Sequence, residues 1–81
     1  MNTKSDLERN LGEQPIAGIL AERGLSAHDL VVASEVPMTH KMVARAVRGR
    51  RLTRNTQEIV RAALEKAVGT SFALEELFNY R

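Results

Sequence analysis

Apolar residues recur every three or four positions along most of this chain, and no alternating strand pattern is visible. That spacing is typical of amphipathic helices, so the sequence predicts an all-α, compact domain of four to five helices. The first helix is expected over residues 15–23, because Pro15 suits a first helical position and Gly24 suits a left-handed helix end. Its inward face is Ile16, Ile19 and Leu20.

A second helix is expected almost directly after the first and should end near Ser34. Ser26 precedes Asp29 by three residues, which is the spacing of a capping box. Pro37 closes the segment, because the residue before a proline disfavours the helical conformation. The inward side is supplied by Leu25, Leu30 and Ala33.

The third predicted helix, residues 39–48, has two faces of opposite character. Thr39 is its expected N-cap, and Gly49 is its expected left-handed end. Its apolar side consists of Met42, Val43, Ala46 and Val47. Its opposite side carries the cations Lys41, Arg45 and Arg48 at i, i+4 and i+7. Burial of the apolar side would fix this helix and present its cations to solvent.

A fourth helix begins at Thr53 or at Asn55, since Asn55 stands three residues before Glu58 in capping-box spacing. It is expected to continue to Val68, before Gly69. Its expected buried stripe is Ile59, Ala63, Leu64 and Val68.

The two ends of the chain differ in character. Residues 1–13 are polar and weakly periodic, which predicts a flexible N-terminal arm followed by one domain over residues 14–81. A short last helix is expected over residues 74–78. The apolar residues of this region are Phe72, Leu77, Phe78 and Tyr80. They either close the core as a lid or form a homodimer contact through the C-terminal helix.

Positive charge is concentrated in one part of the chain. The 81 residues carry a formal net charge of +2 and no cysteine, and this length corresponds to a single domain. Residues 36–57 contain six basic residues and no acidic one, whereas the rest carries six basic against ten acidic residues. The six are Lys41, Arg45, Arg48, Arg50, Arg51 and Arg54. Such a cluster either attracts a polyanion or is an ordinary solvated surface.

Other classes of function find little support. No glycine-rich phosphate loop, HExxH motif or cysteine nucleophile is present, so an enzyme is not expected. His28 and His40 are twelve residues apart without acids at ligand spacing, so neither a metal nor another cofactor is expected. His28 is expected at the surface, and Met38 and Met42 are expected to fill the core. No apolar run reaches membrane-spanning length and the N-terminus is too polar for a signal peptide, so a cytoplasmic protein is expected.

Three stretches match a known pattern. The segment "LSAHDLV" at 25–31 leads into the second helix, "AVRGRR" at 46–51 ends the third, and "IVRAALEKAVG" at 59–69 ends the fourth. Together they resemble the lambda-repressor/Cro family of helix-turn-helix DNA-binding domains over roughly residues 15–68. The resemblance implies sequence-specific binding of double-stranded DNA, with the third helix in the major groove, by a bacterial or phage-like transcriptional regulator.

The resemblance also implies roles for individual residues. Base edges would be contacted by Thr39, His40, Lys41 and Arg45, with Ala44 small enough to let the helix approach closely. DNA phosphates would be contacted by Arg48, Arg50, Arg51 and Arg54. Main-chain N–H groups at helix starts, near Ser26 and Asn55, would bind further phosphates. A lone histidine near a helix start is also commonly a solvated residue, which is the alternative for His40. A dimer would place DNA half-sites about 34 Å apart or a multiple of that distance.

The connection before the third helix departs from the family pattern. Counting back from Gly49 puts Pro37 at the family's turn glycine, whereas counting forward from "LSAHDL" puts Glu35 there. The sequence therefore predicts a turn lengthened around "EVPMT". Val47 also stands where the family has an acidic residue.

Two alternatives to DNA binding remain. The same helices would suit a protein-interaction module, such as an antitoxin-like domain that binds a partner. Basic amphipathic helices also lie on anionic membranes, but the apolar side of the third helix is needed for the core. No small-molecule ligand is inferred.

Overall fold

The computed structural model describes residues 12–79, which form five α-helices and no strand. The helices are α2 (Pro15–Arg23), α3 (Ala27–Ala33), α4 (His40–Arg48), α5 (Arg54–Val68) and α6 (Leu74–Leu77). The predicted all-helical class and the order of its helices are confirmed. The predicted N-terminal arm lies outside the described residues except for Gly12 and Glu13, and Tyr80 also lies outside them.

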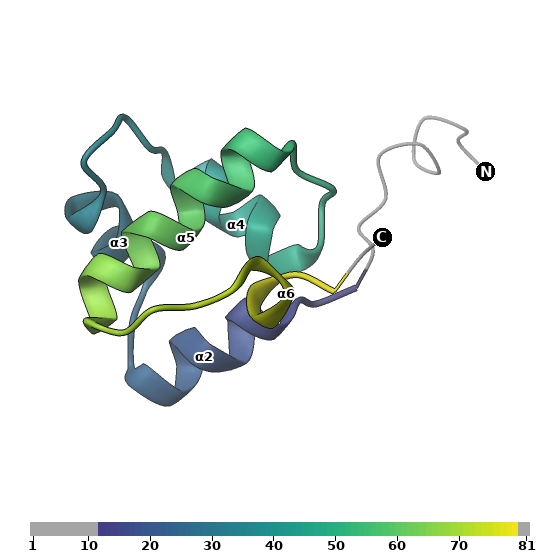
Figure 1. Ribbon diagram of the computed structural model, residues 1–81, viewed down its shortest axis with the longest axis horizontal. Helices are drawn as coiled ribbons and strands as arrows, with labels where there is room; N and C mark the ends of the chain where they lie inside the picture. The colour runs from purple at the N-terminus through teal and green to yellow at the C-terminus, as the bar shows by residue number, and fades with distance from the viewer. Residues whose placement is uncertain (1–11, 80–81) are drawn as a thin grey trace.

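The helices surround one apolar core (Figure 1). The longest helix, α5, packs against α3, α4 and α6, while α2 packs against α4 and α6. The buried apolar side chains are Ile16, Leu20, Leu30, Met38, Val43, Ala46, Val60, Ala63, Leu64, Leu77 and Phe78. Every helix contributes to this set, so no helix of the described chain stands apart from the core.

Local capping chemistry sets the helix ends. Ser26 caps α3 in a capping box with Asp29, and the hydroxyl of Thr39 accepts from Met42 N at 3.1 Å at the start of α4. Gly24 and Gly49 adopt the predicted left-handed conformation after α2 and α4, with φ of 66° and 91°. These ends confirm the predicted boundaries, because each rests on a side chain or a glycine beside it in sequence.

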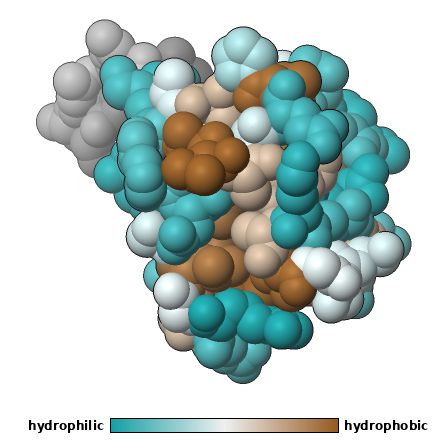
Figure 2. Space-filling view, turned by 90° about the vertical axis from the view of Figure 1, so that its left-hand side faces the viewer, coloured by the Kyte–Doolittle hydropathy of each residue, from teal (hydrophilic) through white to brown (hydrophobic). Residues whose placement is uncertain are grey.

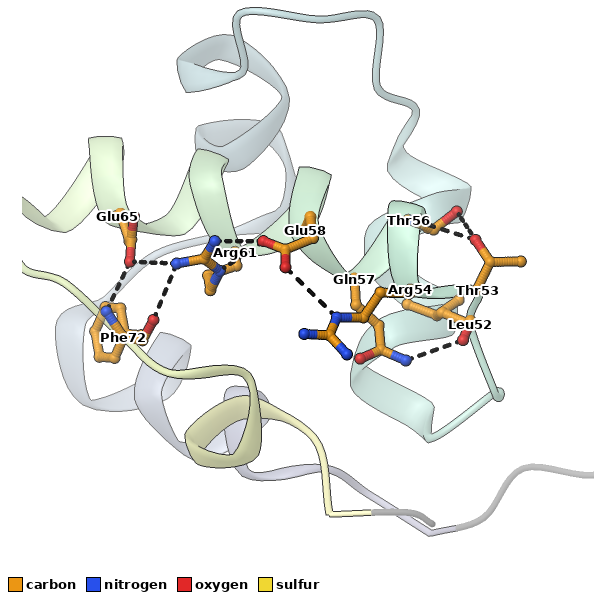
Figure 3. Close-up of polar contacts among 9 residues, drawn as sticks. All are labelled: Leu52, Thr53, Arg54, Thr56, Gln57, Glu58, Arg61, Glu65 and Phe72. Carbon is orange, nitrogen blue, oxygen red and sulfur yellow. Dashed lines mark hydrogen bonds and ion pairs between the residues drawn. The ribbon is translucent and has the colours of Figure 1, made fainter.

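The start of α5 settles an open choice. The hydroxyl of Thr53 accepts from Thr56 N at 3.1 Å, so the helix begins at Arg54 and Asn55 lies inside its first turn. The alternative cap at Asn55 is therefore wrong. Glu58 cannot complete a box with Asn55, and instead it pairs with Arg54 and Arg61 (Figure 3).

The buried stripe of α5 differs from the predicted one. Val60 is fully buried, whereas Ile59 and Val68 are only partly buried. α5 packs against three helices, α3, α4 and α6, and its buried residues are Val60, Ala63 and Leu64. The spacing of apolar residues identifies an apolar side of a helix, but it does not show which of those residues the neighbouring helices bury.

The C-terminal segment closes the core. α6 ends at Leu77, one residue short of the prediction, and both Leu77 and Phe78 are buried against the rest of the domain. This burial favours the lid over a dimer contact for these two residues.

The connection from α3 to α4 spans residues 34–39 without any glycine. The Ser34 hydroxyl donates to Val36 O at 2.7 Å and accepts from Val36 N at 3.3 Å, which forms a local turn. Met38 is buried and anchors the end of the connection in the core. Because no residue here needs a positive φ, Pro37 is accommodated where a shorter turn would favour glycine.

Gln14 joins both described ends of the chain to α4. It is 2% exposed, and its N–H donates to Val47 O at 3.0 Å. Its side-chain amide donates to Gly12 O at 2.8 Å and accepts from Asn79 N at 2.6 Å. The C-terminal end of α4 is therefore fixed by hydrogen bonds, an arrangement that sequence periodicity did not predict.

Candidate nucleic-acid interface

α4 separates into a buried side and a charged side, as its sequence predicts. Val43 and Ala46 are buried, and Met42 and Val47 are partly buried against the same core. The helix packs against α2, α3 and α5, which fixes its orientation. Its polar side chains are thereby held at the surface on a rigid support.

The cations of α4 have no acidic partner in the described chain. Lys41, Arg45 and Arg48 are exposed, and none forms an ion pair with residues 12–79. Arg54, at the first position of α5, lies 3.5 Å from Glu58, but its side chain remains 80% exposed. We define the cationic face as these four residues together with Arg50 and Arg51. Within this face, Lys41, Arg45 and Arg48 leave their charge available to a ligand in solution.

A cavity of 290 Å³ opens between α4 and the start of α5. Three guanidinium-bearing residues line it, Arg45, Arg50 and Arg51, together with the threonines at 39, 53 and 56. The Thr53 hydroxyl also donates to the Thr56 hydroxyl at 2.9 Å (Figure 3). Guanidinium and hydroxyl donors around one hollow suit an oxyanion such as a phosphate.

The two histidines lie together although twelve residues separate them. His40 opens α4 and His28 lies in the first turn of α3, with His28 Nδ1 3.3 Å from His40 Nε2. The two ring planes differ by only 9°. The ring centroids are 5.5 Å apart and the two nitrogens 3.3 Å apart, so the two nitrogens lie between the centroids, close to the line that joins them. The rings therefore meet edge to edge in one plane, as an N–H···N hydrogen bond requires. This contact occupies one nitrogen of the predicted base reader and joins α3 to α4.

The remaining predicted residues occupy different surroundings. Ala44 is partly buried on α4, and Asn55 is exposed in the first turn of α5. At the start of α3, Ser26 N donates to Asp29 Oδ2 at 2.7 Å and the Ser26 hydroxyl donates to it at 3.1 Å. Hydrogen bonds from the Ser26 backbone and side chain lower the pKa of Asp29, so a carboxylate already occupies that helix start.

No protein-family model, curated protein or solved structure matches the chain. Within residues 12–79, no group of three or more histidine, cysteine or acidic side chains is arranged to hold a metal ion. No helix in the same range is long and apolar enough to cross a membrane.

Proposed function

We propose that this protein binds double-stranded DNA sequence-specifically, with α4 in the major groove, and acts as a cytoplasmic transcriptional regulator. An α-helix fits the major groove, and side chains near its start reach base edges. In this proposal Thr39, His40, Lys41 and Arg45 contact bases, and Ala44 permits close approach. The phosphate contacts come from Arg48, Arg50, Arg51 and Arg54, with Asn55 in the first turn of α5. The predicted anchor at Ser26 is left out, because its N–H and hydroxyl already donate to Asp29.

One observation carries the proposal: α4 exposes three cations that no acid within residues 12–79 neutralises, while its opposite side is buried. Like charges four residues apart on a helix cost roughly 0.2–0.5 kcal/mol per pair. A polyanion relieves this repulsion on binding. The cavity beside α4 adds donors where a phosphate would pass.

The resemblance of the sequence to the lambda-repressor/Cro family also supports DNA binding. α3 and α4 would be the two helices of a helix-turn-helix, with the longer connection held by Met38 and by the contact between the two histidines. Catalysis has no part in this proposal, and neither does a cofactor.

The test is selection of binding sites from random duplexes by the full chain at fixed salt. We expect a preferred sequence, and the spacing of any paired half-sites reports whether a dimer binds. Arg45→Ala should relax base preference, by about 1–3 kcal/mol at the base it contacts. Arg51→Ala should weaken binding to all sequences and reduce the dependence on salt.

Arg23→Ala is the matched control, because it removes the same charge from α2, outside the cationic face. It should leave both affinity and base preference unchanged. Failure to select any sequence, or equal losses for the variants at 23, 45 and 51, would refute the assigned contacts.

A further inference from the structure

An apolar groove lies outside α4, since none of the residues that line it belongs to that helix. It has a volume of 640 Å³ and runs between α5 and the residues that end α3 and begin the next connection. Its apolar lining is Ala33, Val36, Ile59 and Ala62. Figure 2 shows the side of the molecule with the groove, where brown and tan atoms run down the middle between teal borders.

The groove exists because small residues face each other. Ala33 on α3 and Ala62 on α5 carry only a methyl group each, although α3 and α5 pack closely along their length. Larger side chains at these positions would fill the space. A hollow of this size is a concave site rather than an extended flat interface.

Apolar exposure is concentrated near this groove. Val36 is 46% exposed and lines it, and Val32, which is 68% exposed, is the residue before Ala33. These two are the large hydrophobic residues left exposed within residues 12–79. Contiguous exposed apolar surface with a polar rim is typical of a protein-binding site.

The rim of the groove is predominantly acidic. Glu35, Glu58 and Glu65 line it together with a single cation, Lys66. Glu58 pairs with Arg54 and Arg61, and Glu65 pairs with Arg61. Lys66 Nζ lies 2.6 Å from Glu35 Oε2, and this pair is more exposed: the side chain of Glu35 is 77% exposed and that of Lys66 is 55% exposed. An exposed pair of this kind is weak, so an incoming cation exchanges with it readily.

We propose that this groove docks a short amphipathic segment of a partner protein, which inserts apolar side chains and places a lysine or arginine against Glu35. A nucleic acid or an anionic membrane is disfavoured as the occupant, because the single cation of the lining, Lys66, is already paired with Glu35 and the lining is otherwise apolar or acidic. A second copy of this chain offers no such segment within residues 12–79, because the apolar side of its basic helix is buried. Docking here leaves the exposed cations of α4 free, and the inference does not depend on DNA binding.

The test is selection of short random peptides on the full chain, followed by calorimetric titration of the enriched peptides. We expect the enriched peptides to combine apolar residues with lysine or arginine. Their addition should shift the amide signals of residues 33–36 and 58–66 in NMR spectra. Absence of enrichment, or enrichment of peptides without basic residues, would overturn the proposal.

Matched variants locate the site. Ala62→Phe fills the groove and should weaken peptide binding about tenfold or more, whereas Ala21→Phe, at an exposed position of α2, should have no effect. Glu35→Gln should weaken binding about two- to fivefold, and Glu22→Gln should not. Equal binding by the variants at 21 and 62 would overturn the proposal, as would self-association of the unaltered chain that Ala62→Phe abolishes.

Discussion

The charged side chains of α4 and those on the outer side of α5 are paired in opposite ways. On α5, Arg61 donates to Glu58, to Glu65 and to the carbonyl of Phe72, so acids and base satisfy one another (Figure 3). On α4, Lys41, Arg45 and Arg48 have no acidic partner among the described residues. The first arrangement stabilises the structure locally, whereas the second leaves charge for a ligand.

The two regions also differ in how they are fixed. Arg61 and Glu65 hold the segment after α5, since Phe72 N donates to Glu65 Oε2 at 2.7 Å. α4 is held instead by its buried side and by the contacts of Gln14 and Gly49 at its C-terminal end. Changes to apolar or backbone contacts should therefore affect α4 most, and changes to charge or pH should affect the outer side of α5.

The largest effect is expected from Gly49→Ala. An added Cβ would stand 2.0 Å from Gly12 O, and the φ of 91° is unfavourable for alanine. We expect a loss of about 3–4 kcal/mol in the free energy of unfolding, measured by urea denaturation. Gly69→Ala is the control, because its φ is 84° with open space around it, and it should cost about 1–2 kcal/mol. Equal losses would show that the contact with Gly12 does not restrain α4.

Gln14→Leu should come next. The substitution keeps a similar volume but removes the partners of Asn79 N and Gly12 O. We expect a loss of about 1–3 kcal/mol in urea denaturation. DNA binding should weaken as well, because residues 12 and 79 no longer hold the segment whose backbone N–H bonds Val47 O at the end of α4. Gln57→Leu removes a single bond to Leu52 O and is the control. If Gln14→Leu lowers stability without any change in DNA affinity, the hydrogen bonds of the Gln14 side chain do not contribute to DNA binding.

Acid should act through the paired carboxylates. A hydrogen bond from Lys66 lowers the pKa of Glu35, and one from Arg61 lowers the pKa of Glu58. The folded state then binds fewer protons than the unfolded state, so stability rises with pH in this range. The urea midpoint should stay level from pH 7 to about 5 and fall below about pH 4. A midpoint that already falls between pH 7 and 5 would contradict this assignment.

The smallest expected effects compare one cation from each region. Arg61→Gln should lower the urea midpoint, because it leaves Glu58, Glu65 and the carbonyl of Phe72 without this donor. Lys41→Gln should leave stability unchanged or raise it by about 0.2–0.5 kcal/mol, since it removes a repulsion four residues from Arg45. A midpoint that falls equally in both variants would remove the distinction between the two regions.

Much of the fold could be predicted from short-range signals. Thr39 and Gly49 bound α4, and Ser26 with Asp29 starts α3, because each feature acts on neighbouring backbone groups. The division of α4 into buried and charged sides follows equally from its spacing. The burial of Val60 was not predicted, because it depends on the helices that pack against α5. The cap at Thr53 was one of two alternatives, because Asn55 is also a favourable cap residue.

Contacts between distant residues were beyond such reasoning. His28 meets His40 because α3 and α4 cross there, and Gln14 meets Asn79 across 65 positions. The groove likewise depends on Ala33 and Ala62 facing each other from different helices. The spacing of residues along the sequence does not predict any of these pairs.

The sequence by itself determined the helices, their caps and the concentration of cations between residues 36 and 57, since propensity, capping and charge are local properties. Only the tertiary structure decided which charges lack acidic partners and which apolar residues remain exposed. Those outcomes depend on which side of each helix its neighbours cover, and that is fixed by packing around a shared core.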